Sequence, residues 1–91
     1  MSKPFDMELF LAGVMTGSQA TRQRHLRQAM IIQAAIADYW QLSTPWAWKR
    51  KHLIWFYDHC LKLHSDAAKY YYLLTIRLLI NRLGKLWELK P

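Results

Sequence analysis

From Ser65 to Gly84 the chain reads SDAAKYYYLLTIRLLINRLG, a stretch that contains a helix start, an apolar stripe and a helix stop. Ser65 or Asp66 can cap the first free N–H groups of a helix, and Gly84 suits the left-handed residue that often ends one. The apolar side chains recur with a period near 3.6, which predicts a helix as far as Leu83. The predicted core stripe consists of Tyr72, Ile76, Leu79, Ile80 and Leu83, while Lys69, Tyr70, Arg77 and Asn81 share another face.

Two helices are predicted in the first half of the chain. Asp6 can cap a short helix over about Met7 to Met15, with Phe5 and Phe10 placed as a hydrophobic staple. A long helix follows the Thr16-Gly17-Ser18 turn, is capped by Ser18 or Thr21 and reaches Trp40. Its predicted core stripe is Ala29, Ile32, Ile36 and Tyr39, widened by Leu26, Met30 and Trp40.

A third long helix is predicted between these segments. Thr44 can act as its N-cap and Pro45 can occupy its first position, where a missing N–H costs nothing. This helix should run without interruption to about Leu63. Its predicted buried residues are Leu53, Phe56, Tyr57, Cys60 and Leu61, and Trp87 in the tail should fold back onto the core. We therefore expect an all-α fold, a compact bundle of one short and three longer helices without strands.

The composition predicts one small, strongly basic domain. Of the 91 residues, 53% are hydrophobic, and this length is too short for two independent cores. Thirteen Lys and Arg against six Asp and Glu give a net charge of +7, and residues 21–91 hold twelve of these bases but only four acids. A compact cationic body favours a polyanionic partner, with nucleic acid ahead of a membrane surface.

Residue types that perform catalysis or bind metals form no recognisable motif. His52 and His59 are seven residues apart on the predicted third helix, a spacing unsuited to a shared zinc ion. Cys60 falls on the apolar face and is interpreted as a small core residue. There is no phosphate-binding glycine loop and no nucleophile elbow. We expect no enzyme activity, metal, cofactor or small-molecule substrate.

The chain is predicted to be cytoplasmic. No charge-free apolar run approaches the roughly 18 residues that a membrane span needs. Asp6 and Glu8 fall where a signal peptide requires an uncharged stretch, and a single cysteine suits a reducing compartment.

The order of the predicted helices resembles a known DNA-binding domain. A short helix precedes Ser18-Gln19-Ala20-Thr21, and the next helix carries Thr21, His25 and Ala29 at intervals of four. Then come the Trp46 to Leu63 helix and a Ser65-initiated helix that ends in Ile76-Arg77-Leu78-Leu79-Ile80-Asn81-Arg82-Leu83. Over nearly the whole chain this pattern resembles the N-terminal core-binding, SAM-like domain of tyrosine recombinases, the phage integrase family. His25, Ala29 and Ala68 depart from it, because that family usually has Tyr, a larger residue and Thr there.

The resemblance implies binding of double-stranded DNA without catalysis. In that family this domain clamps one side of the duplex, while a separate C-terminal domain carries the catalytic residues, including a His-x-x-Arg motif that this chain lacks. A recombinase catalytic domain or other protomers are the further partners it implies. The residues expected to face DNA are Thr21, Arg22, Gln23, Arg24, His25, Arg27, Gln28, Lys49, Arg50, Lys51, Lys69, Tyr70 and Arg77. Most would contact phosphates, and Gln23, Arg24 or Gln28 could read base edges.

Two alternatives follow from the aromatic residues. Trp46, Trp48 and Trp55 cannot all lie on one core-facing stripe, and exposed Trp is enriched at interaction hot spots. A small protein-interaction or regulatory module of a mobile element is therefore the second hypothesis. A membrane-surface protein, suggested by bases mixed with Trp, ranks last because each predicted helix has a core stripe.

Overall fold

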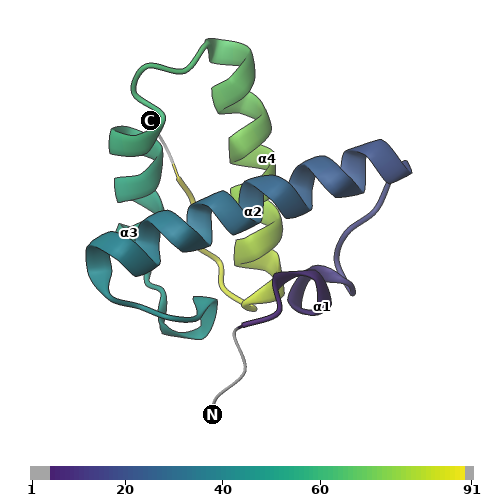
Figure 1. Cartoon of the computed structure of the whole chain (residues 1–91), viewed down its shortest axis with the longest axis horizontal. Coiled ribbons are helices and arrows are strands. Elements are labelled where there is room, and N and C mark those ends of the chain that lie inside the picture. The colour runs from purple at the N-terminus through teal and green to yellow at the C-terminus, as the bar shows by residue number, and fades with distance from the viewer. Residues whose placement is uncertain (1–4, 90–91) are drawn as a thin grey trace.

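The long helices α2 and α4 cross, and the other elements pack around the crossing (Figure 1). The computed structural model describes residues 5–89, and in that range the chain is helical with no strand. In chain order the elements are α1 (Met7–Leu11), α2 (Gln19–Trp40), the 3-10 turn η1 (Pro45–Ala47), α3 (Arg50–Trp55), the π-helical turn η2 (Phe56–Cys60) and α4 (Asp66–Arg82). The predicted all-α bundle of four helices is confirmed, but α3 is short like α1, so that only α2 and α4 are long. The radius of gyration of the bundle, 12.6 Å, is close to the value of about 12 Å for a folded chain of this length.

The core lies between α2 and α4. Ala29 and Ile32 of α2 are fully buried, as are Ile76 and Leu79 of α4. The small side chain of Ala29 permits close approach of the two helices. Contacts from α1 reach both of them, and η2 packs on α2.

The predicted starts of α1, α2 and α4 are confirmed. Asp6, Ser18 and Ser65 each accept a hydrogen bond from the backbone N–H three residues later, at 3.0, 3.2 and 3.1 Å. The rings of Phe5 and Phe10 meet edge-on with centroids 5.2 Å apart, as expected of the hydrophobic staple. Local hydrogen bonding therefore determines where these helices begin.

The first helix ends at Leu11, and the prediction that it reaches Met15 is wrong. In a longer helix the carbonyl oxygen of Phe10 would accept from the N–H of Val14. Instead, Nε of Arg82 donates to that oxygen at 2.6 Å, and the N–H of Val14 donates to Leu11 at 3.0 Å. A side chain from the end of α4 thus takes the place of the next helical turn.

The predicted continuous helix from Pro45 to Leu63 is also wrong. Trp48 and Lys49 have extended backbone with ψ of 149° and 167°, and they separate η1 from α3. Trp48 is buried at 3% exposure. The N–H of Lys49 donates to Nδ1 of His52 at 2.8 Å, so that α3 begins with a new cap.

The turn η2 changes which residues face the core. Leu53, Phe56 and Leu61 are buried, whereas Tyr57 and Cys60, which were predicted to be buried, are only half-buried. A π-helical turn holds more residues than an α-helical turn, and it brings the fifth residue after Phe56 to the core side.

Two aromatic or apolar positions of α2 do not belong to the core. Met30 is 55% exposed and Tyr39 is 64% exposed, contrary to the predicted stripe. Met30 lies on the outward side of α2. Tyr39 lies near the end of the helix, where its ring stacks on Trp55 with centroids 4.6 Å apart.

The end of α4 agrees with its prediction. Gly84 has φ of 72°, and the N–H of Lys85 donates to the carbonyl five residues earlier at 3.2 Å. These are features of a Schellman motif. The tail then returns along α4, and Trp87 is half-buried against the core as expected.

Gly84→Ala should lower the free energy of unfolding by about 1–2 kcal/mol, because an alanine at positive φ is strained even where space is open. Gly13→Ala is the matched control, because its φ is not positive and a Cβ there meets nothing within 4 Å. Urea unfolding measures both variants. Equal stability of Gly84→Ala and the unchanged protein would contradict the left-handed helix end.

Candidate nucleic-acid interface

A buried polar network joins α2 to α4 at their crossing. The Thr75 hydroxyl oxygen lies 2.8 Å from Nδ1 of His25, and the hydroxyl donates to Oε1 of Gln28 at 2.8 Å. The network is complete when the hydroxyl proton goes to Gln28 and a proton on Nδ1 of His25 is donated to Thr75. All three side chains are buried. Burial lowers the pKa of His25, with the charge of Arg24 as the smaller cause, so the neutral imidazole is favoured.

This burial does not agree with the expectation that His25 and Gln28 face DNA. Both side chains hold the two helices together, and neither is free to reach a phosphate or a base. The sequence contains a signal for this burial, because His25 lies four residues before the core residue Ala29 and Gln28 lies four residues before the core residue Ile32. Thr75 was not predicted as a functional or structural residue, although it lies four residues before Leu79 in the stripe of α4.

Arg24 is held against the ring of Tyr71. The guanidinium carbon lies 4.4 Å from the ring centroid, and Tyr70 meets the Tyr71 ring edge-on at 5.7 Å. Nε of Arg24 is buried without a hydrogen-bond partner, and no carboxylate of residues 5–89 forms a salt bridge with this side chain. Tyr70 and Tyr71 are 56% and 42% exposed. We call Arg24, Tyr70 and Tyr71 the Arg24–Tyr71 surface.

Arg27 lies at the edge of this surface, on the outward side of α2. Its side chain is exposed. Burial raises the pKa of Tyr72, and the positive charge of Arg27 opposes that rise. Arg27 follows Arg24 by three residues, so the two side chains are neighbours on the surface of α2. Arg27 therefore adds positive charge next to Arg24.

The remaining predicted residues at the start of α2 lie elsewhere. A helix turns about 100° per residue, so Arg22 and Arg24 point about 160° apart around α2. Arg22 and Gln23 are exposed on the side of α1, where they line a groove together with Glu8. Thr21 is half-buried, and its hydroxyl accepts from the Ser18 hydroxyl at 3.1 Å. The carboxylate of Glu8 weakens any attraction of this side for phosphate.

The basic cluster Lys49–Lys51 lies near the other end of α2. Nζ of Lys51 lies 5.6 Å from the ring centroid of Trp40, and Nε of Arg50 donates to a backbone carbonyl of the tail at 2.8 Å. Trp40 follows Arg24 by a rise of about 24 Å along the helix axis. The structure therefore does not bring this cluster together with the Arg24–Tyr71 surface.

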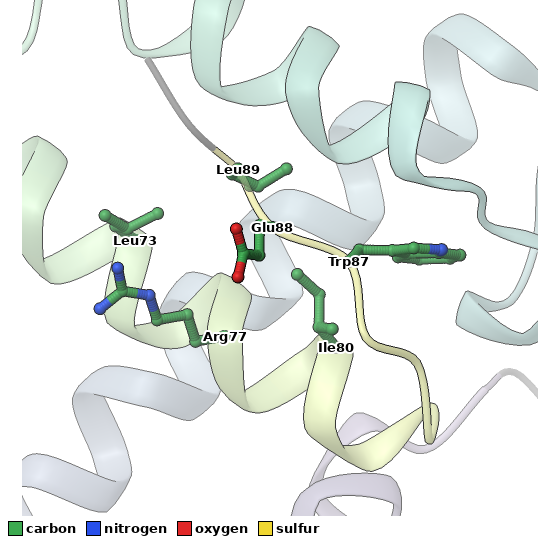
Figure 2. Close-up of a pocket in the computed structure, with 6 residues that line it drawn as sticks. All are labelled: Leu73, Arg77, Ile80, Trp87, Glu88 and Leu89. Atoms are coloured by element: carbon green, nitrogen blue, oxygen red, sulfur yellow. The ribbon is translucent and has the colours of Figure 1, made fainter.

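Two predicted residues of α4, Arg77 and Lys69, point to other sides of the helix than Tyr71, the residue that contacts Arg24. Arg77 follows Thr75 by two residues, so it is turned about 160° from the side that faces α2. Figure 2 shows Arg77 where the tail passes α4, and with Leu73 and Ile80 it lines a cavity of about 350 Å³. Lys69 is half-buried and points to the opposite flank of α4 from Tyr71.

The same part of the chain offers little support for other kinds of site. Within residues 5–89 no three His, Cys, Asp or Glu side chains could hold a metal ion. Burial raises the pKa of the Cys60 thiol, which disfavours the reactive thiolate. No helix in that range is long and apolar enough to cross a membrane. The expectation that the chain is not an enzyme stays a prediction.

Comparison with known proteins gives no match among family models, curated proteins or solved structures. The resemblance to core-binding domains therefore rests on the sequence pattern alone. His25, which replaces the usual Tyr of that pattern, is the residue that bonds to Thr75.

Thr75→Val should lower the free energy of unfolding by about 2–4 kcal/mol, because it leaves two buried polar groups, on His25 and Gln28, without a partner. The triple variant His25→Leu, Gln28→Met and Thr75→Val removes every member of the network. It should recover most of the lost stability, since no buried polar group is then left unpaired. Urea unfolding compares them, and a triple variant less stable than Thr75→Val would contradict the network.

Stability should fall on acidification. Burial lowers the pKa of both His25 and His52, and the charges of neighbouring cations lower it further. The unfolded chain, whose histidines titrate near about 6.5, therefore binds more protons in mildly acidic solution than the folded chain does. The urea midpoint should be highest above about pH 7 and should decrease between pH 6.5 and 5. A midpoint that is unchanged or higher at pH 5 would contradict the neutral, hydrogen-bonded histidines.

Proposed function

We propose that the protein binds double-stranded DNA through the Arg24–Tyr71 surface, as a non-catalytic core-binding domain of an integrase-like protein. The observation that supports this most strongly is an arginine that is held in place but not neutralised. Arg24 lies 4.4 Å above the Tyr71 ring, and no carboxylate of the described chain pairs with it. A phosphate from outside would supply the missing anion.

The stacking of Arg24 prepares it for such a contact. A free arginine loses side-chain entropy on binding, and the Tyr71 ring already removes part of that freedom. The planar guanidinium can donate two parallel hydrogen bonds to one phosphate. The exposed ring of Tyr70, which meets the Tyr71 ring at 5.7 Å, carries a hydroxyl that can donate to a phosphate as well.

The net charge supports the same partner at longer range. Residues 21–91 carry twelve bases and four acids, so a polyanion is attracted before any specific contact forms. Arg27 reinforces the surface at its edge. The cluster Lys49–Lys51 and Arg77, on other sides of the molecule, add attraction without geometric selectivity.

The recombination context comes from the resemblance to the tyrosine recombinase domain. A catalytic domain or other protomers, and a cytoplasmic location, belong to that proposal. The alternative function, a small protein-interaction module, was suggested by the tryptophans, but their surroundings give it little support. Trp46 is 58% exposed but its ring packs on Phe10 at 5.0 Å, Trp48 is buried, and Trp55 stacks on Tyr39.

Arg24→Gln should weaken binding to a 20-base-pair duplex by about five-fold or more and should reduce the slope of log affinity against log salt by about one. Each lost phosphate contact releases one fewer counterion, which is the reason for the change in slope. Fluorescence anisotropy at several salt concentrations measures both quantities. Arg24→Lys should be intermediate, because it keeps the charge but loses the planar, stacked fork.

Arg22→Gln is the matched control, since it removes the same charge from the same helix but from the opposite flank. Its effect should be clearly smaller than that of Arg24→Gln. Equal losses in both variants would indicate diffuse attraction and would contradict the proposed surface. Absence of duplex binding by the unchanged protein at about 50 mM salt would overturn the proposal as a whole.

A further inference from the structure

The outward side of α2 carries a stripe that is apolar in the middle and oppositely charged at its ends. The stripe consists of Arg27, Ile31, Ala34 and Asp38, which follow one another at intervals of four, three and four residues and are all exposed. Ile31 is 45% exposed, and with the neighbouring Met30 it lines an open groove of about 450 Å³. In Figure 1, α2 lies in front of α4 with no other segment across it.

The spacing of the stripe is that of a helix-packing seam. Side chains at alternating intervals of three and four stay on one side of a helix, and such seams allow two helices to pack side by side. The side of α2 that packs on α4 has its own residues, among them Ala29 and Ile32. The stripe is therefore a second seam that the described chain leaves without a partner.

The stripe is complementary to a second copy of itself that runs in the opposite direction. Arg27 and Asp38 lie equally far from the point between Ile32 and Gln33, and the same point lies midway between Ile31 and Ala34. When two copies of α2 pair antiparallel around it, Arg27 of each copy faces Asp38 of the other. Ile31 then faces Ala34 twice. A two-fold axis generates both sets of contacts, as an isologous interface requires.

We propose that a second copy of this chain covers the stripe, forming an antiparallel α2–α2 homodimer. The charge pattern selects a second copy as the occupant, because the stripe complements itself when reversed. The small Ala34 opposite Ile31 allows the helix axes to approach within about 8–10 Å. The inference does not rest on DNA binding, and Arg24 lies outside the overlap, one turn before Arg27.

Charge reversal tests the pairing directly. Arg27→Asp and Asp38→Arg each place two pairs of like charges in the interface, and each should raise the dimer dissociation constant at least about ten-fold. The double variant restores opposite charges in every pair and should return the constant to within about three-fold of the original value. Sedimentation velocity at several protein concentrations, without DNA, measures all four proteins. Circular dichroism checks folding, which these exposed substitutions should not disturb.

If only general repulsion between the positively charged copies mattered, the Arg27→Asp variant would give a different result. Arg27→Asp lowers the net positive charge of the chain, so general repulsion alone would favour association in that variant, whereas the proposed pairing disfavours it. For the apolar part, Ile31→Lys should dissociate the dimer, and Leu63→Lys, on a side chain 96% exposed away from α2, should not. A monomer at every concentration would overturn the proposal. Single reversals without effect, or a double variant that fails to recover, would overturn it as well.

Discussion

The hydroxyl group of Thr75 bonds to both His25 and Gln28, and the rest of the structure depends on this contact between α4 and α2. All three side chains are buried, and each buried polar group without a partner costs about 1–3 kcal/mol. Sliding α2 along α4 by one turn would leave the side chains of His25, Gln28 and Thr75 without hydrogen-bond partners. Apolar packing alone would tolerate such a shift more easily, so the network specifies the register of the crossing.

That register determines which parts of α2 are used and which remain free. With His25 and Gln28 against α4, Arg24 comes to lie on the Tyr71 ring, 4.4 Å from its centroid. Arg22 is turned toward α1 instead. The side opposite the crossing, with Ile31 and its neighbours, remains exposed to solvent. One interaction in the core thus positions both the proposed DNA surface and the proposed dimer stripe.

Much of the fold could be predicted from the sequence because its signals are local. Caps such as Ser18 and Ser65 act on N–H groups three residues away, and the apolar period is visible within each helix. One error arises because a distant residue intervenes: Arg82 takes the Phe10 carbonyl and ends α1. The candidate site was predicted only in part for the same reason. Basic residues are easy to find, but the crossing point decides that Arg24 joins Tyr71 while Arg77 points away.

The α2–α4 crossing creates the surface that we propose binds DNA. The most direct measurement is a titration of the isotope-labelled protein with a short duplex, followed by NMR at the amides and the arginine side chains. The largest shifts are expected at Arg24, Tyr70 and Tyr71, with smaller ones at Arg27 and little change at Arg22 or Lys49–Lys51. A map centred on Lys49–Lys51 or Arg77, with Arg24 unaffected, would contradict this proposal.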